Sequence, residues 1–424
     1  MRLLVVGGGG REHALVWKIN QSPLVEKIYC APGNPGISEL AEQVAIDAED
    51  LEELLHFAEE QKIDLTVVGP EAPLVAGITD LFASRGLAVF GPNQKAAQME
   101  GSKVFAKEFL RKYGIPTANF RVFESFDSAY YYLKNTDFPI VIKADGLAAG
   151  KGVTVAQNRE QAFMALQQIM QEKKFGAAGE RVVIEDCLYG EEVSVLVLTD
   201  GKDYLLLPDA QDHKAALEGD RGPNTGGMGA YSPAPVFSEE LKKNVEEKII
   251  KPVLKGLQNE GITYRGVLYA GLMITDAGPL VLELNGRFGD PETQVILPRI
   301  VSDIVPLLIA CAGGVLKGHT LEIAPDYCAC VVLASQGYPG AYKKGFLIEG
   351  LENFSAHTNP LVFQAGTKEK NGQVFTAGGR VLGVTAWDIN LKGTLEKVYE
   401  AVDKINFKGK HFRRDIGYRA LKRF

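Results

Sequence analysis

Hydrophobic and polar residues alternate along the stretch 279–294, which is PLVLELNGRFGDPETQ. Because successive side chains of a strand point to opposite faces, Val281, Glu283 and Asn285 are predicted on one face and the neighbouring leucines on the other. The carboxylate and the amide oxygen are hard ligands that suit Mg²⁺, and Arg287 follows between two turn-prone glycines. The stretch therefore predicts a strand end that handles phosphoryl oxygens. The alternative is an amphipathic edge strand with a polar exit.

Residues 2–90 alternate between apolar runs and segments with helical spacing. This alternation predicts strand and helix units that form a parallel, doubly wound sheet. The glycines at 7–10 match a dinucleotide-binding fingerprint only weakly, because the second strand does not end in the acid that would hold a ribose hydroxyl. A glycine loop at a helix N-terminus, with Arg11 beside it, indicates a phosphate site for a substrate. The alternative is a tight turn that packs the strand on the helix.

The segment 93–113 has helical spacing that Gly101 interrupts, and Ser102 is placed to cap a second helix. Lys103 falls in the first turn of that helix, where the helix dipole disfavours a cation. This position favours a ligand phosphate next to Lys103, and the alternative is a solvated lysine.

A strand, a glycine-rich loop and a second strand follow one another between 140 and 156. This order excludes a Walker P-loop, in which the loop opens a helix and the lysine precedes Ser or Thr. A hairpin loop that contains Gly150 and Gly152 can instead fold over phosphates as a mobile flap. Lys143, at the end of the first strand, is expected to place a positive charge beneath that flap.

A helix is expected at about 159–171, followed by the strand RVVIED and the segment CLYGEEVSVLVL. The apolar strand resumes after a glycine turn, so this junction is predicted to be a hinge between two lobes. Its backbone amides and Glu185 offer contacts to a flat base, and Glu191 or Glu192 could reach a ribose.

Residues 209–235 are polar and glycine-rich and show no periodicity, which predicts a long irregular loop. Loops of this length are uncommon in compact domains unless they are functional or disordered. The composition fits a loop that closes over a substrate better than a linker. The residues that suggest this role are Asp212, His213, Lys214, Asn224, Thr225, Gly226 and Gly227.

The remaining chain predicts an amphipathic helix, a strand that leads into the opening stretch, further helices and a small α+β unit. The amphipathic helix is expected at 238–259 and should bend at Pro252. The small unit begins near Cys328 and includes a helix at about 391–405. The basic segment 408–424 is predicted to be a solvated face and chain end, because the chain as a whole is acidic.

Composition narrows the possible functions. The 424 residues carry a formal net charge of -7 and are 46% hydrophobic, as in an ordinary folded protein, and this length predicts about two to four structural units. The acidic balance argues against nucleic-acid and membrane partners. The five cysteines are scattered, and Cys328 and Cys330 are predicted in a buried strand and not in a zinc site. The first apolar run is too short for a signal peptide, and 304–316 is too short to cross a bilayer, so a cytoplasmic enzyme is expected.

Motifs along the whole chain resemble one known family. GGGGREH, APGNPG, GPEAPL, KADGLAAGKGV, GPNTGGMGAYSP and NGRFGDPETQ occur in this order. Together they are similar to the glycinamide ribonucleotide synthetase family of ATP-grasp ligases. The resemblance implies an ATP-grasp fold of the α/β and α+β multidomain class. It also implies a Rossmann-like pre-grasp domain at 1–102, an ATP-grasp core at 103–328 with a flap inserted at about 121–190, and a small C-terminal α+β cap at 329–424.

The resemblance implies an activity as well. Members of the family use ATP to join glycine to 5-phosphoribosylamine through glycyl phosphate, which gives glycinamide ribonucleotide, ADP and phosphate in de novo purine biosynthesis. Mg²⁺ or Mn²⁺ is the implied metal, and a monomer without nucleic-acid or membrane partners is expected. Rival hypotheses are another ATP-grasp carboxylate–amine ligase or carboxylase, a regulatory nucleotide-binding protein without catalysis, and a dinucleotide-dependent oxidoreductase.

The same resemblance implies residue roles. The expected metal ligands are Glu283 and Asn285. The expected contacts to ATP are Lys103, Lys143, Gly150, Gly152, Glu185, Leu188, Glu191 and Glu192. The expected contacts to the substrates are Gly9, Gly10, Arg11, Asp212, Lys214, Asn224, Thr225, Gly226 and Arg287. The residues to which catalysis is assigned are Arg287, Lys143 and Asp212.

Two features depart from common patterns. The substrate loop contains DHKAAL, so Ala215 stands where an arginine often follows the lysine. That arginine cannot be essential here, or the affinity for an anionic group is reduced. The strand GVLYAGLMI carries no acid that could add a second metal carboxylate, so the number of metal ions stays open.

Overall fold

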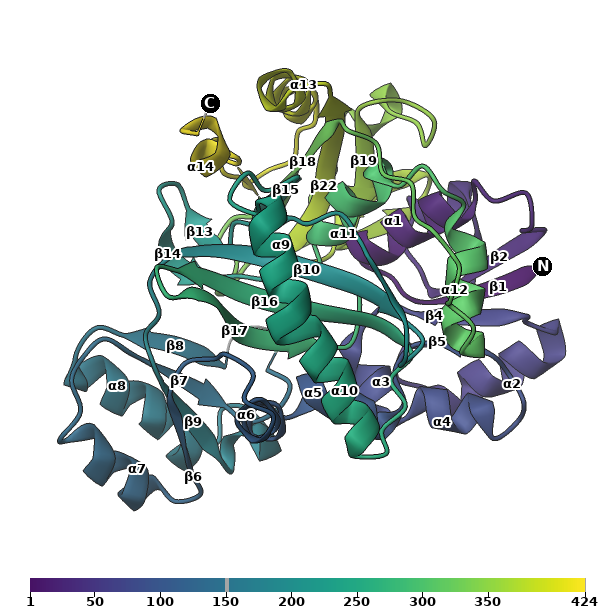
Figure 1. The fold of residues 1–424 in the computed structure, drawn as a ribbon. Helices are drawn as coiled ribbons and strands as arrows, with labels where there is room; N and C mark the ends of the chain where they lie inside the picture. Colours follow the sequence, from purple (N-terminus) through teal and green to yellow (C-terminus); the bar gives the residue numbers. More distant parts are fainter. Residues whose placement is uncertain (149–151, 424) are drawn as a thin grey trace.

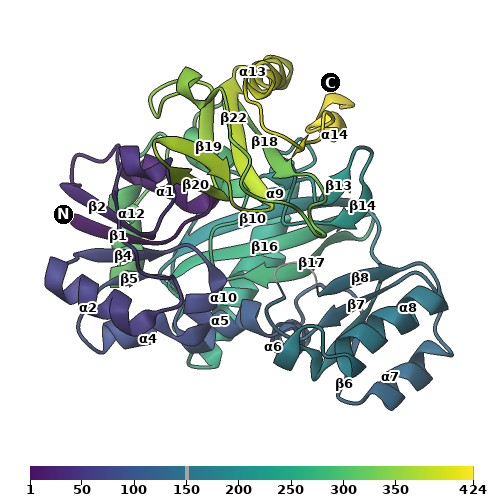
Figure 2. The ribbon, with the colours of Figure 1, turned by 180° about the vertical axis from the view of Figure 1, so that it is seen from behind.

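The computed structural model describes residues 1–148 and 152–423. Figures 1 and 2 show an N-terminal, a central and a C-terminal sheet packed against one another, with a smaller sheet and its helices projecting from one end. Gly150 of the predicted flap loop lies outside the described residues. Within those residues, no helix is both long and apolar enough to cross a bilayer.

The N-terminal sheet is parallel, as the alternation of strands and helices predicted. Its strands are β1 (Arg2–Gly7), β2 (Lys27–Pro32), β3 (Glu42–Gln43), β4 (Leu65–Val68) and β5 (Val89–Phe90), in the order β3-β2-β1-β4-β5. Its helices are α1 (Gly10–Ile19), α2 (Leu51–Gln61), α3 (Glu71–Ala76) and α4 (Ile78–Ala83). Leu3 and Val5 share a core with α1, whereas Leu4 and Val6 share one with α2 and α4. Both faces of β1 are therefore covered, which explains its continuous apolar run.

The central sheet is antiparallel, and helices cover one of its faces. Its strands are β10 (Glu191–Thr199), β11 (Tyr204–Leu206), β16 (Gly266–Thr275) and β17 (Gly278–Asn285), in the order β11-β10-β16-β17. The covering helices are α5 (Gln94–Gly101), α6 (Lys103–Lys112), α9 (Glu239–Val245) and α10 (Lys251–Asn259). Val195, Leu268 and Val281 of the sheet are buried in one core with Phe109 and Val253 of the helices.

Helix boundaries follow the sequence signals. Ser102 accepts a hydrogen bond from the backbone N–H of Phe105 and so caps α6, as predicted. The helix predicted at 238–259 is present, but a π-helical turn at Glu246–Ile250 interrupts it and ends two residues before Pro252. Proline has no backbone N–H for the helical ladder, so the ladder changes its pattern where the bend was expected.

A β-bulge in β17 changes the predicted alternation. Two neighbouring residues of β16 pair with Glu283 and Val281, so Leu282 is an additional residue. Val281 is 0% exposed in the core beneath the helices. The prediction that Val281 shares a face with Glu283 and Asn285 is therefore wrong, because a bulge shifts the two-residue period by one. Glu283 and Asn285 do line the same cavity.

A smaller antiparallel sheet forms the flap region (Figure 2). Its strands are β6 (Phe120–Phe123), β7 (Ile140–Ala144), β8 (Val153–Ala156) and β9 (Val182–Asp186), in the order β6-β9-β7-β8. Its helices are α7 (Phe126–Leu133) and α8 (Arg159–Leu166), and α8 continues as a π-helical turn at Gln167–Gln171. The antiparallel pairing of β7 with β8 confirms the predicted order of strand, loop and strand.

The C-terminal sheet takes two of its strands from the segment predicted to be a loop. Its strands are β12 (Gln211–Asp212), β15 (Gly229–Ser232), β18 (Tyr327–Ser335), β22 (Arg380–Asp388) and β19 (Leu361–Gln364), and β23 (Lys410–His411) pairs with β18. A separate hairpin is formed by β13 (Ala215–Leu217) and β14 (Arg221–Asn224). The prediction of an irregular loop at 209–235 is wrong, because strands this short show no recognisable period and β15 finds its partner β18 far along the chain.

The remaining elements connect and cover these sheets. They are α11 (Glu292–Ile296), α12 (Ile304–Gly313), α13 (Leu391–Lys404), α14 (Tyr418–Leu421) and the hairpin of β20 (Thr367–Lys370) and β21 (Gln373–Thr376). Cys328 and Cys330 are buried in one core on β18, as predicted for a strand. Ala329 and Val331 point to the opposite core, which α13 covers.

The basic segment 408–424 is not only a solvated chain end. Arg413 is 0% exposed and forms ion pairs with Asp220 and Asp415. Arg419 also pairs with Asp220. The prediction of a solvated face is therefore wrong here, because carboxylates, including that of Asp220 between β13 and β14, neutralise these guanidinium groups. Figures 1 and 2 both show α14 next to this hairpin.

Candidate active site

A cavity of about 510 Å³ lies where the four sheets approach one another. Its lining includes most of the residues that the sequence singled out. They are Arg11, Lys103, Lys143, Gly152, Glu185, Asp212, Lys214, Asn224, Thr225, Gly226, Glu283, Asn285 and Arg287. The predicted residues that do not belong to this lining, as far as the described chain shows, are Gly9, Gly10, Leu188, Glu191, Glu192, His213 and Gly227.

Glu283 and Asn285 reach the cavity from the end of β17. The Oε1 atom of Glu283 lies 3.7 Å from the Nζ atom of Lys214. Lys214 lowers the pKa of Glu283 to about 2, while burial opposes the shift and Lys143 and Lys103 assist it. The carboxylate is therefore ionised at neutral pH and can act as a hard oxygen ligand.

This donor set fits a cation that completes its coordination with substrate phosphates. In the parts of the chain that the structure describes, no group of three or more His, Cys, Asp and Glu side chains is placed to hold a metal ion. Mg²⁺ commonly uses one or two protein oxygens together with phosphate oxygens and water. Glu283 and Asn285 therefore suit Mg²⁺ or Mn²⁺ bound with a nucleotide better than a metal held by protein alone.

Lys103 and Lys143 place two ammonium groups in the cavity. Lys103 donates to the carbonyl oxygen of Gly146 at 2.7 Å, and Lys143 donates to that of Leu282 at 3.0 Å. Burial lowers the pKa of Lys103, and Glu283 opposes this shift. Because each ammonium group has three N–H donors, both lysines retain capacity for phosphate oxygens.

Glu185 lies between two lysines on the cavity wall. Lys107 donates to its Oε2 atom at 2.8 Å and to the hydroxyl of Thr117 at 2.7 Å, and Lys143 lies 3.0 Å from its Oε1 atom. Burial lowers the pKa of Lys107 to about 8, with Lys143 adding to the shift and Glu185 opposing it. Sequence reasoning missed Lys107. Its spacing of four from Lys103, which puts both on one helix face, was the available signal.

The hinge residues lie beside this wall. Glu192 forms an ion pair with Lys214, with 2.8 Å between Oε2 and Nζ. Glu191 instead pairs with Arg423 near the C-terminus, and Leu188 is half-buried after β9. Of the two candidate ribose carboxylates, Glu192 is the one linked to the cavity.

Arg287 is held by two glutamates that sequence reasoning did not assign. Its guanidinium lies 2.8 Å from Glu100 and 3.5 Å from Glu71, and Glu100 also accepts the backbone N–H of Gly286 at 2.8 Å. Burial disfavours the guanidinium, but Glu100 and Glu71 outweigh it and raise the pKa of Arg287. Glu71 lies in the motif GPEAPL, whereas nothing in the local pattern marks Glu100.

The N-terminal glycine turn wraps around Glu12. A Cβ atom on Gly7, whose φ is +119°, would lie 2.6 Å from the Cγ atom of Glu12, and the N–H of Gly9 donates to Glu12 at 2.6 Å. Arg11 donates to Glu12 at 2.7 Å and to the carbonyl of Phe288 at 3.1 Å. The turn thus packs β1 against α1, and Arg11 lines the cavity.

Asp212 and Lys214 enter the cavity from the segment that begins with β12. Burial and Glu292 raise the pKa of Asp212, and its Oδ1 atom has no hydrogen-bond partner among the described residues. Burial disfavours the charged form of Lys214, but Glu192 and Glu283 outweigh it and raise the pKa of Lys214. A carboxyl group in this setting suits the ammonium group of a ligand, whose charge would favour the ionised form.

The C-terminal sheet contributes Arg380, which sequence reasoning missed. Arg380 donates to the carbonyl of Gly226 at 2.5 Å and to the carbonyl and carboxylate of Asp290 at 2.7 and 2.9 Å. The N–H of Gly226 donates to the hydroxyl of Tyr338 at 3.1 Å. These bonds hold the segment 224–226 at the cavity wall. Arg380 follows two glycines in a β-rich run, and its partners lie too far along the chain for a local pattern to indicate them.

The fold and the cavity define the class of the protein. An antiparallel central sheet and a smaller flap sheet meet at a cavity that contains two lysines and two side-chain oxygens suited to bind a metal ion. This is the arrangement of ATP-grasp enzymes. The biotin carboxylase domain of a Hydrogenobacter thermophilus 2-oxoglutarate carboxylase, solved with MgADP, has a TM-score of 0.74 at 15% identity and covers 97% of this chain and 91% of its own. At this identity the likeness shows the fold alone. The predicted ATP-grasp architecture is confirmed by the match of residues 101–293 to a family model of an ATP-grasp domain.

Family models match nearly the whole chain. The N domain of phosphoribosylglycinamide synthetase matches residues 1–100, its ATP-grasp (A) domain residues 101–293 and its C domain residues 328–419. The chain belongs to the phosphoribosylglycinamide synthetase family.

Relatives of the chain include several proteins named phosphoribosylamine–glycine ligase. A phosphoribosylamine–glycine ligase of Caldanaerobacter subterraneus is 50% identical over 98% of this chain and 99% of its own length, and that of Pseudomonas aeruginosa is 50% identical over 100% and 99%. The human trifunctional purine biosynthetic protein adenosine-3 is 50% identical over 99% of this chain, which spans 42% of the human protein. The crystal structure of the Thermotoga maritima phosphoribosylamine–glycine ligase has a TM-score of 0.86 at 35% identity and covers 98% of this chain and 100% of its own.

Proposed function

We propose that this protein uses ATP to ligate glycine to 5-phosphoribosylamine, which gives glycinamide ribonucleotide, ADP and phosphate in de novo purine biosynthesis. The observation that carries the proposal is the cavity between the sheets, which combines Lys103 and Lys143, the oxygens of Glu283 and Asn285, and the carboxyl of Asp212. Relatives of about the same length at 50% identity are named for this ligase activity.

The first step transfers a phosphoryl group. A carboxylate oxygen of glycine forms a bond to the γ-phosphorus of ATP as the bond to the bridging oxygen breaks, which gives glycyl phosphate and ADP. Lys103 and Lys143 hold the phosphate oxygens, because a loose phosphoryl transition state needs positioning and charge neutralisation more than a covalent nucleophile. Arg287 holds the glycine carboxyl and its acyl phosphate. Mg²⁺ or Mn²⁺, held by Glu283 and Asn285, supplies Lewis-acid charge at the phosphate oxygens when bound.

The second step forms the amide. The nitrogen of 5-phosphoribosylamine attacks the carbonyl carbon of glycyl phosphate, the C–O bond to phosphate breaks, and the nitrogen loses a proton as phosphate leaves. Asp212 binds the ammonium group of glycine, and Arg11, with Gly9 and Gly10 behind it, binds the ribose phosphate. Lys214 and the segment 224–226 complete the substrate wall. Acyl phosphates hydrolyse readily, so this wall must also exclude water.

The nucleotide base belongs at the hinge in this proposal. Glu185 and Leu188 contact the adenine, and Gly152 of the predicted flap loop, which lines the cavity, contacts the phosphates. Gly150 of the same loop, also assigned to ATP, lies outside the described residues. Glu192 binds the ribose hydroxyls in preference to Glu191, because Glu192 is already linked to the cavity through Lys214.

The proposal extends to the organisation of the protein. The functional units are 1–102 for the substrate phosphate, 103–328 for ATP with its flap at about 121–190, and 329–424 as a cap. The protein is proposed to act as a cytoplasmic monomer on small molecules, without nucleic-acid or membrane partners. Sedimentation equilibrium tests the monomer directly, and a stable dimer would contradict it.

The test of the activity is ADP release with Mg²⁺, ATP and glycine, with and without freshly generated 5-phosphoribosylamine. Release only with both substrates, and none when alanine or aspartate replaces glycine, is the expected result. ADP release that is indifferent to the ribosylamine would favour another ATP-grasp carboxylate–amine ligase or carboxylase. ATP binding without turnover would favour a regulatory protein.

A further inference from the structure

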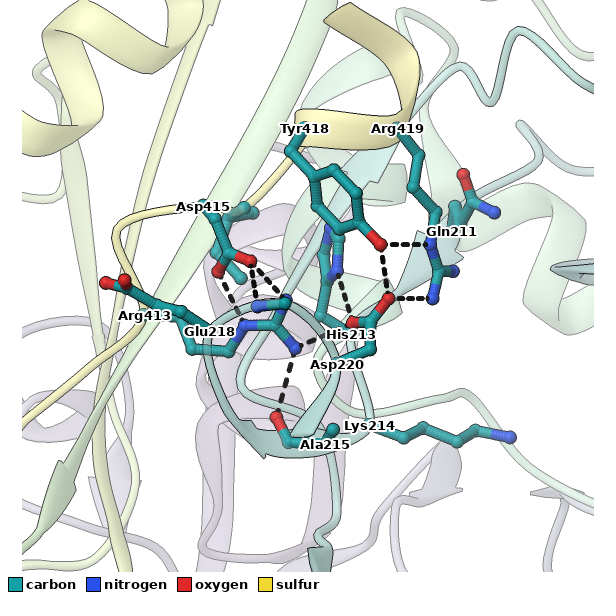
Figure 3. Close-up of polar contacts among 12 residues, drawn as sticks. Gln211, His213, Lys214, Ala215, Glu218, Asp220, Arg413, Asp415, Tyr418 and Arg419 are labelled. Carbon is teal, nitrogen blue, oxygen red and sulfur yellow. Dashed lines mark hydrogen bonds and ion pairs between the residues drawn. The ribbon is translucent and has the colours of Figure 1, made fainter. Parts of the chain in front are cut away.

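A closed polar cluster binds the hairpin of β13 and β14 to the C-terminal segment (Figure 3). Asp220, in the turn of the hairpin, lies at its centre. Its carboxylate is 3.0 Å from the guanidinium of Arg413, accepts the hydroxyl of Tyr418 at 2.5 Å and pairs with Arg419. Burial opposes ionisation of this carboxylate, but His213, Tyr418 and Arg419 outweigh it and lower the pKa of Asp220.

The backbone of the turn also depends on these contacts. Asp220 has a φ of +54°, a left-handed conformation that non-glycine residues adopt only where their surroundings hold them. The neighbouring N–H of Gly219 donates to Asp415 at 2.8 Å. Arg413, fully buried, donates to the same Asp415 carboxylate through two nitrogens at 2.7 and 2.8 Å. The C-terminal segment therefore holds the turn through both its side chain and its backbone.

The C-terminal segment also forms hydrogen bonds with the residues on both sides of Lys214. The ring nitrogen Nε2 of His213 accepts the N–H of Gly417 at 3.0 Å, and Arg413 donates to the carbonyl of Ala215 at 3.1 Å. Figure 3 shows Lys214 pointing away from the cluster. Its ammonium group lies in the cavity, 2.8 Å from a carboxylate of the hinge and 3.7 Å from the one at the end of β17.

We propose that the tail clamp, defined as Asp220 with Arg413, Tyr418 and Arg419, positions Lys214 in the cavity. These are positioning residues, since they do not line the cavity within the described chain. Arg413 donates to the carbonyl of Ala215, and the carboxylate of Asp220 lies 3.7 Å from the ring of His213. The clamp thus contacts both backbone neighbours of Lys214, and that lysine in turn pairs with carboxylates of the site. The catalytic consequence rests on the function proposed above, whereas the positioning of Lys214 does not.

The first test measures the reactivity of the Lys214 amine towards acetic anhydride in the full-length protein, by peptide mass spectrometry. Lys214 is held inside the cavity in ion pairs with two carboxylates, so its acetylation should be slow compared with that of the exposed Lys404. Asp220→Asn keeps the shape of the clamp and removes its charge. We expect the ratio of Lys214 to Lys404 acetylation to rise roughly 3- to 10-fold, as for the loss of one ordinary hydrogen bond.

The matched control is Arg414→Ala in the same segment. The Arg414 side chain is 61% exposed and pairs with an equally exposed Asp403, so the acetylation ratio should not change. An unchanged ratio in folded Asp220→Asn would overturn the proposal. If that variant does not fold, Tyr418→Phe removes a single hydroxyl from the clamp and decides the test in the same way.

A double-mutant cycle tests whether the clamp acts through Lys214. Asp220→Asn should lower kcat/KM in the wild-type background and have no further effect beside Lys214→Met. Full additivity of the two losses would overturn the proposal, since it would mean a route other than Lys214. Failure of the proposed function has a different signature. The wild type would then release no ADP with glycine and 5-phosphoribosylamine, while the acetylation result would stand.

Discussion

Two walls of the cavity are built in opposite ways. In the strand-end wall, Glu283, Asn285 and Arg287 follow one another within a short stretch after the bulge in β17. In the assembled wall, Lys214 is placed by contacts such as that between Ala215 and Arg413, which are 198 residues apart. The alternation of side chains at a strand end, followed by a turn, can thus bring several functional side chains together from one short stretch of sequence. The assembled wall, in contrast, forms only when the C-terminal segment packs against the residues on either side of Lys214.

The two walls nevertheless meet in one electrostatic system. Lys214 of the assembled wall is the largest cause of the low pKa of Glu283 in the strand-end wall. The strand end supplies the ligands, but distant charges determine their protonation. Substitutions that remove a contact within one wall, or a contact between distant elements, therefore test whether the two walls act independently.

The largest effect is expected from Glu283→Ala. Loss of the carboxylate at the transferring phosphate should reduce kcat by at least about 10³-fold. The side chain lines a cavity and is partly exposed, so the protein should still fold, but loss of the ion pair with Lys214 should lower the free energy of unfolding by about 1–2 kcal/mol. ADP release and thermal unfolding measure the two quantities, with the exposed Glu240→Ala as control. Near wild-type turnover would remove Glu283 from the metal site.

Arg287→Met tests whether the strand-end wall depends on distant partners. The substitution leaves Glu100 and Glu71 without their cation, so we expect a loss of about 3–5 kcal/mol in unfolding free energy. We also expect a fall of about 10²–10³-fold in kcat/KM, because charge at the acyl phosphate is no longer neutralised.

The double variant Arg287→Met with Glu100→Gln sharpens this test. An amide at position 100 needs no counter-charge, so part of the stability should return while the activity stays low. Denaturant unfolding of both variants gives the comparison. If Glu100→Gln restores no stability, the unpaired carboxylate of Glu100 is not the cause of the loss in Arg287→Met.

The difference between the walls also explains what the sequence could reveal. The β7–β8 hairpin and the cap at Ser102 were predictable because each depends on neighbours in sequence, and the parallel N-terminal sheet was predictable because strands and helices alternate along the chain. The bulge at Leu282 was not, because nothing in an alternating pattern marks an inserted residue. A buried charged side chain such as Arg413 cannot be distinguished from a surface residue in the sequence, because its ion-pair partner lies far away along the chain. The sequence thus predicts side chains on one element well, and side chains that pair across elements poorly.

His13 forms a contact between α1 and β19 that protonation of its ring would break. It lies on α1, accepts the N–H of Gln364 at 2.9 Å and packs edge-on against Phe363 of β19. Burial lowers its pKa from 6.5 to about 4. Between these values the unfolded chain binds a proton that the folded protein does not. The unfolding free energy should therefore fall as pH decreases from 6.5 to about 4, by about 3 kcal/mol in total.

Urea unfolding at a series of pH values measures this loss. His13→Gln should flatten the profile between pH 6.5 and about 4, because the buried group no longer titrates. His56→Gln removes a histidine whose side chain is 63% exposed and should leave the slope unchanged. Equal slopes for wild type and His13→Gln would show that another group controls acid sensitivity.

The smallest effect is expected from Lys107→Met. Lys107 joins α6 to Glu185, 78 residues further along, and so belongs to the assembled contacts of the nucleotide end. Its loss leaves Glu185 with Lys143 alone, which should raise the KM for ATP about 10-fold and leave kcat within about two-fold. Lys112→Met on the same helix removes an exposed partner of Glu260 and should change neither value.

The pH dependence of this KM separates a charge effect from a packing effect. Because the pKa of Lys107 is lowered to about 8, the wild type loses the ion pair with Glu185 as pH rises through that value. The KM for ATP should then rise in the wild type and stay flat in Lys107→Met, where no proton can be lost. A parallel rise in both proteins would mean that Lys107 supports ATP binding by its packing and not by its charge. Ion pairs between distant elements would then matter less around Glu185 than in the assembled wall that contains Lys214.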